Sequence, residues 1–121
     1  MLTELGKILR KIRIDHQELL RDMATTLNVS AAYLSAVETG KRNAPLAWID
    51  KIIDGYRLNA DEAQELQNAF DASQGELKIP LQQISSLQRS TALSFAKALE
   101  GLSDEQLKII MNVVQKGNKK E

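Results

Sequence analysis

The stretch Met23–Pro45, MATTLNVSAAYLSAVETGKRNAP, decides how this chain folds. Two short helical patterns meet within it at Leu27-Asn28-Val29-Ser30, with almost no chain between them. Helices joined so closely leave little space at the corner, so Ala24 is expected where they approach and Val29 as an apolar plug beneath the turn. The sequence therefore predicts two packed helices joined by a tight turn.

The second helix of this pair is predicted to run from Ala31 to Thr39. Ser30 is suited to its start, because a serine hydroxyl can accept a hydrogen bond from an unpaired amide in the first turn. Leu34 and Val37 are three residues apart and face inward, and Gly40 ends the helix. The residues left on or near the outer face are mostly small: Ala31, Ala32, Tyr33, Ser35 and Ala36. This arrangement is a helix-turn-helix.

One helical pattern precedes this motif, and a second forms the first helix of the motif. The first runs from Thr3 to Ile14, with apolar residues at helical spacing and a basic opposite face. The second begins at Gln17 or Glu18 and ends at Thr26. Its expected buried residues are Leu19, Met23 and Leu27, whereas Leu20 is expected either to pack against the first helix or to be exposed.

Two further helices are predicted after the motif. Pro45 suits a first helical turn, and the apolar pattern that follows places Trp48 in the core. Asn59 and Glu62 then form a capping-box-like start for a fifth helix that ends near Gln74. The expected fold is all-α, with a five-helix globule over residues 1–74.

The remaining residues are predicted to form a linker and a C-terminal helical segment. Gly75 opens a linker over residues 75–84, in which Glu76–Leu81 alternates polar and apolar residues and is expected to be extended or a strand. The segment 85–121 holds a sixth helix ending at Gly101 and a seventh capped by Ser103-Asp104-Glu105-Gln106. Asn118–Glu121 is expected to be a frayed tail.

The seventh helix is apolar on more than one face between Leu107 and Val114. A terminal helix on a small globule cannot cover two such faces with its own chain, so we expect it to dimerise or bind a partner. The alternative is that it folds back under the fifth helix and joins the core.

Several positions agree in order and spacing with a known pattern: Leu9-Arg10-Lys11-Ile12-Arg13, Ala24, Leu27-Asn28-Val29-Ser30, Leu34-Ser35, Glu38-Thr39-Gly40-Lys41-Arg42 and Pro45. In these residues the chain resembles the phage-repressor, or Cro-like, helix-turn-helix regulators, also called the XRE family. The resemblance covers roughly the first half of the chain and implies a lambda-repressor-like fold. It departs at Asn28, where the family usually has Gly, and at Leu20, where it often has a Gln that contacts a DNA phosphate.

The resemblance also implies roles for particular residues. The helix that starts at Ser30 would lie in the major groove and read bases through Ala31, Ala32, Tyr33, Ser35 and Ala36. Phosphate contacts would come from Ser30, Lys41, Arg42, Asn43, Arg10 and Lys11. Arg13 and Glu38 would form a partly buried structural ion pair. Because the reading helix has no outward Arg, Asn or Gln for a bidentate base contact, DNA shape is expected to supply part of the preference.

Composition adds limits to these functions. The net charge is zero, but residues 1–58 carry nine basic and seven acidic side chains, a slight excess that alone would not indicate DNA binding. The absence of cysteine excludes disulfides and zinc fingers, and His16 is the only histidine, so neither a metal site nor a catalytic dyad nor a cofactor is expected. No signal peptide or membrane span is predicted, so a cytoplasmic location is expected.

The favoured function is a homodimeric, sequence-specific regulator that binds double-stranded DNA, acts as a repressor and recognises an inverted-repeat operator. The C-terminal helices would join the two copies. The alternative is an antitoxin that represses its own operon and binds a toxin protein through its C-terminal region. The apolar seventh helix fits both, so the sequence does not decide between them.

Overall fold

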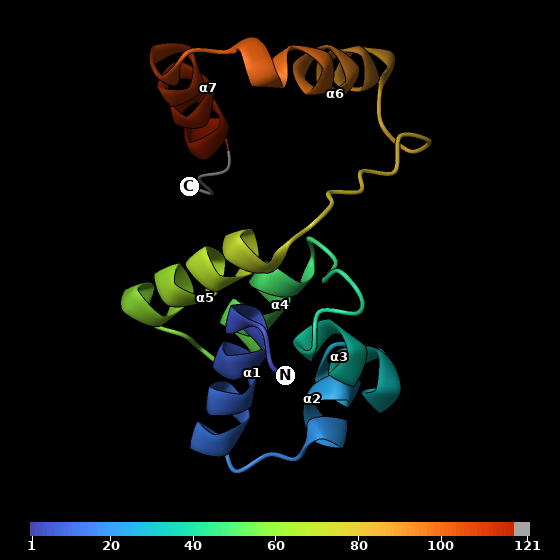
Figure 1. Ribbon diagram of the computed structural model, residues 1–121, viewed down its shortest axis with the longest axis vertical. Coiled ribbons are helices and arrows are strands. Elements are labelled where there is room, and N and C mark those ends of the chain that lie inside the picture. The colour runs from blue at the N-terminus through green and yellow to red at the C-terminus, as the bar shows by residue number, and fades with distance from the viewer. Residues whose placement is uncertain (118–121) are drawn as a thin grey trace. The chain divides into compact units, whose positions relative to one another are not determined.

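The computed structural model describes residues 1–117 (Figure 1). Its regular elements in this range are all helices, with no strand, so the all-α prediction is confirmed. Its contacts divide the chain into two compact units, the first spanning Met1–Lys78 and the second beginning at Ile79. The first unit contains α1 (Glu4–Asp15), α2 (Leu20–Thr26), α3 (Ala31–Glu38), α4 (Trp48–Gly55) and α5 (Ala60–Ser73). The second contains α6 (Ser86–Ala98), the 3-10 helix η1 (Leu99–Gly101) and α7 (Asp104–Gly117).

The core of the N-terminal unit is built from one apolar stripe of each of its helices. Leu9, Met23, Leu34 and Leu66 are completely buried, and they come from α1, α2, α3 and α5. Trp48 of α4 is only 2% exposed, as expected of a core anchor. Helix α1 packs against both α5 and α3, so it lies at the centre of the unit.

A glycine allows the close approach of α1 to the end of α3. A Cβ atom at Gly6 would lie 2.2 Å from the carbonyl oxygen of Glu38. That same oxygen accepts hydrogen bonds from the backbone N–H of Thr3, at 2.9 Å, and from its hydroxyl, at 3.2 Å. Only a residue without a side chain fits at this contact, which holds α3 in position relative to α1.

The start of α2 differs from the sequence prediction. The helix begins at Leu20 rather than at Gln17 or Glu18, because Gln17 has a φ of 57°, in the left-handed region that interrupts a helix. Leu19, which was expected to be buried, is the N-cap residue and is 57% exposed. Leu20 is instead the residue that packs, partly buried, against the core.

Helix α4 also starts later than predicted, at Trp48 rather than at Pro45. Pro45 belongs to a turn in which its carbonyl oxygen accepts a hydrogen bond from the N–H of Trp48 at 3.1 Å. The capping box at the start of α5 is confirmed: Asn59 and Glu62 each accept a hydrogen bond from the backbone N–H of the other.

The C-terminal unit has well-capped helices but no buried residue in them. Ser85 caps α6 together with Gln88, and Ser103 caps α7 together with Gln106, the second as predicted. The alternating segment 76–81 is coil and not a strand, because no neighbouring strand pairs with it. The expected frayed tail, Asn118–Glu121, lies outside the described residues.

Candidate nucleic-acid interface

The corner between α2 and α3 is closed by backbone hydrogen bonds. Asn28 has a φ of 58°, the positive angle that asparagine tolerates better than most residues. The N–H of Asn28 donates to the carbonyl of Thr25 at 3.0 Å, and the N–H of Val29 donates to that of Ala24 at 2.9 Å. Ser30 then caps α3 by accepting from the N–H of Tyr33 at 3.0 Å. These bonds fix the direction in which α3 leaves the turn.

The outward face of α3 is open to solvent in its middle and partly covered at its edges. Ala32 and Ser35 are exposed, whereas Ala31, Tyr33 and Ala36 are half-buried. The expected reading residues thus lie on an accessible face, but they are not equally accessible. The exposed surface consists of a methyl group and a hydroxyl, flanked by partly covered neighbours.

Tyr33 has a structural role that the sequence analysis missed. Its ring packs edge-on against Trp48 with 5.9 Å between the centroids, and its hydroxyl donates a hydrogen bond to the carbonyl of Asn43 at 3.3 Å. The guanidinium of Arg42 lies 6.0 Å from the centre of the same ring, within reach of a cation–π interaction. Tyr33 therefore connects α3 to the loop that follows it.

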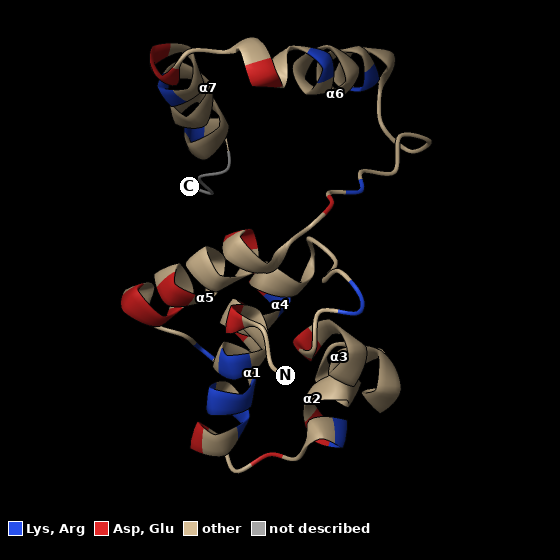
Figure 2. Cartoon of the chain, viewed as in Figure 1, with Lys and Arg blue, Asp and Glu red and all other residues tan. Residues whose placement is uncertain are grey.

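That loop presents two exposed cations beside α3. Gly40 has a φ of 81°, and the N–H groups of Lys41 and Arg42 both donate to the carbonyl of Ala36. Figure 2 shows the blue basic residues of this loop and a second basic stretch on α1. Within residues 1–117, no carboxylate lies at ion-pair distance from Lys41 or Arg42, so both charges are available to an anion.

The end of α5 holds the far end of this loop. The side chain of Gln74 accepts from the N–H of Ala44 at 3.1 Å and donates to its carbonyl at 3.0 Å. Asn43 accepts from the N–H of Gly75 at 3.3 Å through its side-chain oxygen. Because these partners are about 30 residues apart in the chain, no local sequence signal could have revealed the clamp.

The two expected phosphate-side cations of α1 lie on different sides of that helix. The Lys11 ammonium is 3.9 Å from a carboxylate oxygen of Glu65 on α5. Arg10 is exposed, and consecutive helical residues point about 100° apart. Lys11 is therefore directed toward α5, about 100° around the helix from Arg10.

Arg13 and Glu38 form an ion pair that joins α1 to the end of α3. Their residues are 8% and 4% exposed. One guanidinium nitrogen donates to each carboxylate oxygen, with the Nη2–Oε1 distance at 3.1 Å, and Nη1 also lies 3.5 Å from the sulfur of Met23. The pair is bidentate and mostly excluded from water, so it fixes the orientation of α3 on α1.

A second polar cluster, Glu18, Tyr56 and His16, lies where α4 ends. The Tyr56 hydroxyl donates a hydrogen bond of 2.6 Å to a carboxylate oxygen of Glu18. Burial, reinforced by this hydrogen bond, raises the pKa of Tyr56 well above its usual value. The ring of His16 packs edge-on against that of Tyr56, with 5.0 Å between centroids. The histidine thus takes part in packing at this surface.

Comparison with known proteins identifies the family of the N-terminal unit. Within residues 1–117, no helix combines the length and hydrophobicity needed to cross a bilayer. No curated protein and no solved structure matches the chain at a significant level. A family described as a helix-turn-helix domain matches residues 4–66, just over half of the chain and the part that runs from α1 into α5. The chain therefore belongs to the helix-turn-helix domain family, a family of DNA-binding regulators.

Proposed function

We propose that this protein is a sequence-specific regulator that binds double-stranded DNA as a homodimer, at an inverted-repeat operator, and represses transcription in the cytoplasm. The observation that carries the proposal is the accessible face of α3, whose side chains are mostly small. Beside it lie two cations, Lys41 and Arg42, that have no ion-pair partner within residues 1–117. A smooth helical face can enter the major groove without steric conflict, and cations next to it can contact the sugar-phosphate backbone. We assign no catalytic role and no cofactor.

Base reading would be carried by a small number of contacts. The methyl groups of Ala31, Ala32 and Ala36 suit contact with thymine methyl groups, and the exposed hydroxyl of Ser35 can donate or accept a hydrogen bond. Tyr33 would contribute through its ring edge, because its hydroxyl already donates to a loop carbonyl. Such contacts discriminate weakly between bases, so the deformability and groove width of the operator would supply part of the specificity.

Phosphate binding would come mainly from the loop after α3. Lys41 and Arg42 are exposed and have no acidic partner in the described part of the chain. Ser30 and Asn43 would contribute polar contacts at the two ends of α3 and its loop. Arg10 is a more distant candidate, and Lys11 is the weakest of the set because Glu65 of α5 lies beside it.

The loop cations are tested by replacing both with alanine. Lys41→Ala with Arg42→Ala should weaken binding to every DNA sequence and reduce the slope of log K against log salt by about two. The matched control removes two exposed cations from the same unit, Lys51→Ala with Arg57→Ala. Equal slopes for the two double variants would refute the assignment of Lys41 and Arg42 to the phosphate backbone.

Dimeric binding follows from the size of one reading unit. A single helix-turn-helix contacts only a few base pairs, so a useful affinity requires two copies on two half-sites. The expected operator is an inverted repeat whose half-sites are about one helical turn apart, or a multiple of that. Selection of bound sequences from a random DNA pool tests this, because a monomeric reader would enrich single half-sites. A reporter driven by the selected operator would show whether binding represses.

The exposed apolar surface of the C-terminal unit also supports a second function, that of an antitoxin. Leu93, Leu99, Ile109 and Val113 are all at least 44% exposed, and a toxin protein could cover them. Such a protein would repress its own operon through the same α3 face. Mixing the purified chain with the product of a small reading frame adjacent to its gene distinguishes the two functions. Formation of a stable complex that inhibits this product would favour the antitoxin.

A further inference from the structure

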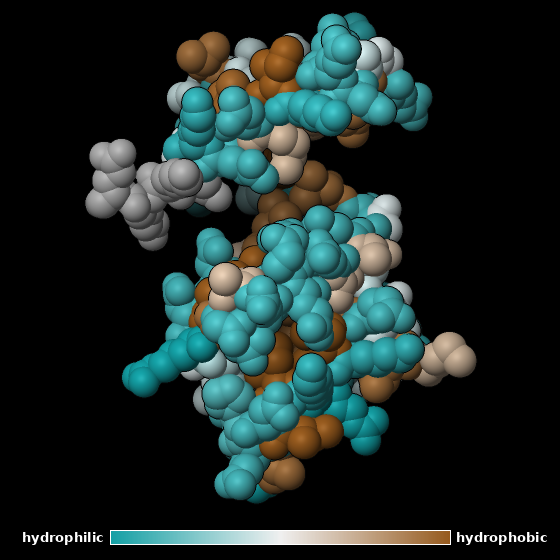
Figure 3. Space-filling view, turned by 90° about the vertical axis from the view of Figure 1, so that its left-hand side faces the viewer, coloured by the Kyte–Doolittle hydropathy of each residue, from teal (hydrophilic) through white to brown (hydrophobic). Residues whose placement is uncertain are grey.

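The C-terminal unit lacks a core of its own. Not one residue of α6, η1 or α7 within the described chain is buried, and hydrophobic side chains, brown in Figure 3, reach the surface of this unit. Segments of about 40 residues rarely stabilise themselves without oligomerisation, disulfides or a metal. This sequence contains no cysteine, and within residues 1–117 no group of side chains could hold a metal ion, so oligomerisation is the remaining route.

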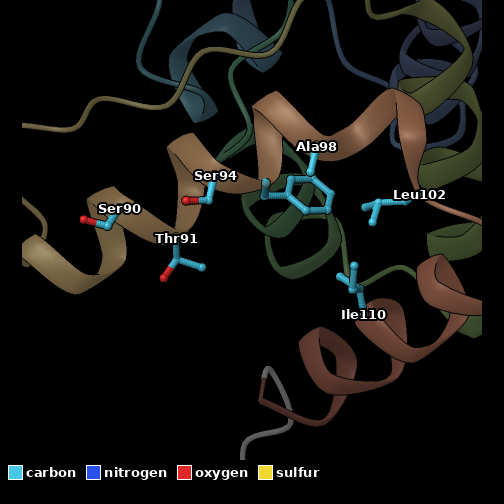
Figure 4. Close-up of a pocket in the computed structure, with 7 residues that line it drawn as sticks. Ser90, Thr91, Ser94, Ala98, Leu102 and Ile110 are labelled. Atoms are coloured by element: carbon cyan, nitrogen blue, oxygen red, sulfur yellow. The ribbon is translucent and has the colours of Figure 1, made fainter.

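One side of α7 is already directed toward α6. Between the two helices lies an open groove of about 520 Å³, lined by Phe95, Ala98 and Leu102 among others. Figure 4 shows Ile110 directed from α7 toward this groove. Leu107 and Ile110 are correspondingly half-buried, whereas Ile109 and Val113, about half a turn or less away around the helix, are each 65% exposed. The face that contains Ile109 and Val113 is therefore free to bind a partner.

This free face carries an acidic residue at one end and a basic residue at the other. Glu105, Ile109, Val113 and Lys116 are spaced at i, i+4, i+8 and i+11, which places them within about 80° of the helix circumference. We call these four residues the α7 stripe. It reads acid, apolar, apolar, base along the chain. Within residues 1–117, none of the ion pairs involves α7, so the two charges of the stripe have no partner in their own unit.

We propose that the α7 stripe pairs antiparallel with the α7 stripe of a second copy, about a two-fold axis that crosses the stripe midway between Ile109 and Val113. In this arrangement Glu105 of each copy faces Lys116 of the other, and Ile109 faces Val113. A parallel pairing would place acid against acid and base against base. Two-fold interfaces of this kind use the same surface on both copies, and antiparallel helices also align their dipoles favourably. The proposal rests on the proposed homodimer and locates its interface.

The position of the axis is tested by cross-linking the full chain without DNA. Because the protein has no natural cysteine, a single introduced cysteine reports on one position. Asn112 flanks the stripe beside the axis, so Asn112→Cys should form a disulfide-linked dimer under mild oxidation. Met111→Cys is the matched control, because it lies at the same height on the opposite side of α7 and should stay monomeric. Equal or faster cross-linking of the control would overturn the proposal.

The direction of pairing is tested by charge reversal, read by sedimentation equilibrium. Glu105→Lys and Lys116→Glu should each raise the dimer dissociation constant by about tenfold, because each change turns two exposed ion pairs into repulsive contacts. The chain with both changes should return to within about twofold of the original value. A double variant that dimerises no better than the single ones would overturn antiparallel pairing, and a monomeric unmodified chain would overturn dimerisation through α7.

These outcomes are separate from those of the DNA-binding proposal. If cross-linking fails while Lys41 and Arg42 still set the salt slope of DNA binding, only the α7 interface is wrong. If the α7 dimer forms but the chain binds no DNA, the interface stands and the regulatory function falls.

Discussion

Removing Glu38 should destabilise the N-terminal unit far more than removing an exposed acid. Glu38→Ala leaves the guanidinium of Arg13 without its carboxylate in a site where the arginine is only 8% exposed. Breaking a buried ion pair by deleting one partner lowers the free energy of unfolding by about 3–5 kcal/mol. Glu65→Ala is the control, because its side chain is 53% exposed and its contact with Lys11 is long, so the expected loss is below about 1 kcal/mol.

These free energies translate into a clear difference in melting temperature. For a unit of this size, each kcal/mol corresponds to about 4–8 °C in Tm, so Glu38→Ala should lower Tm by more than about 12 °C. Trp48 is the only tryptophan and is 2% exposed, so its fluorescence follows the unfolding of the N-terminal unit alone. Urea unfolding measured by the same signal gives the free energies directly.

A double replacement shows whether the loss comes from the stranded charge. Arg13→Met combined with Glu38→Leu removes both charges and keeps apolar volume, so it should be markedly more stable than Glu38→Ala. If Glu38→Ala shifts Tm no more than Glu65→Ala does, the pair does not hold α3 on α1. If the double variant is as unstable as the single one, the loss has a cause other than an unpaired charge.

Three further outcomes are expected. Gly6→Ala should lower the free energy of unfolding by about 1–3 kcal/mol, because its Cβ would meet a carbonyl oxygen at 2.2 Å, whereas Gly101→Ala, with nothing within 4 Å, should leave Trp48 unfolding unchanged. Because the pKa of Tyr56 is raised, the folded state keeps a phenolic proton that the unfolded chain releases above pH about 10. The free energy of unfolding should therefore fall as pH rises above about 10, and Tyr56→Phe should flatten this fall when it is measured by urea unfolding. Ala32→Glu should abolish DNA binding in a fluorescence anisotropy assay without loss of stability, whereas Ala72→Glu, exposed on α5, should preserve it.

Much of the fold was predictable because it depends on local patterns. Apolar spacing identified the order of the α-helices but not the short 3-10 helix η1, and the capping pairs at Asn59 and Ser103 marked two of the helix starts. The positive φ at Asn28 falls on a residue type that tolerates this angle better than most. These features are set within a few residues of each position, so a single sequence carries them.

The details that escaped prediction depend on distant residues. The loop before α4 is held at Ala44 by hydrogen bonds to the side chain of Gln74, and α4 begins only after this loop. The half-burial of Tyr33 depends on its packing against Trp48. Leu19 is exposed rather than buried because the left-handed turn at Gln17 shifted the helix start, and of the two alternatives for Leu20 the structure shows packing against the core. Periodicity shows which residues are apolar, but it does not show which of two adjacent leucines meets the core.

In the proposed dimer, weak base reading by α3 and pairing of α7 would be complementary parts of one mechanism. Contacts through methyl groups and one exposed hydroxyl favour a correct half-site only modestly, so a single unit would occupy many sequences. Gly75 is bonded to Asn43 and the carbonyl of Leu81 is bonded to Arg89, so only residues 76–80 separate the two anchored parts of the chain. In the proposed dimer, two such short connections would give the N-terminal unit of the second copy a high effective concentration once that of the first copy has bound. Two modest preferences then multiply, and a dimer can select an operator that neither α3 helix would select alone.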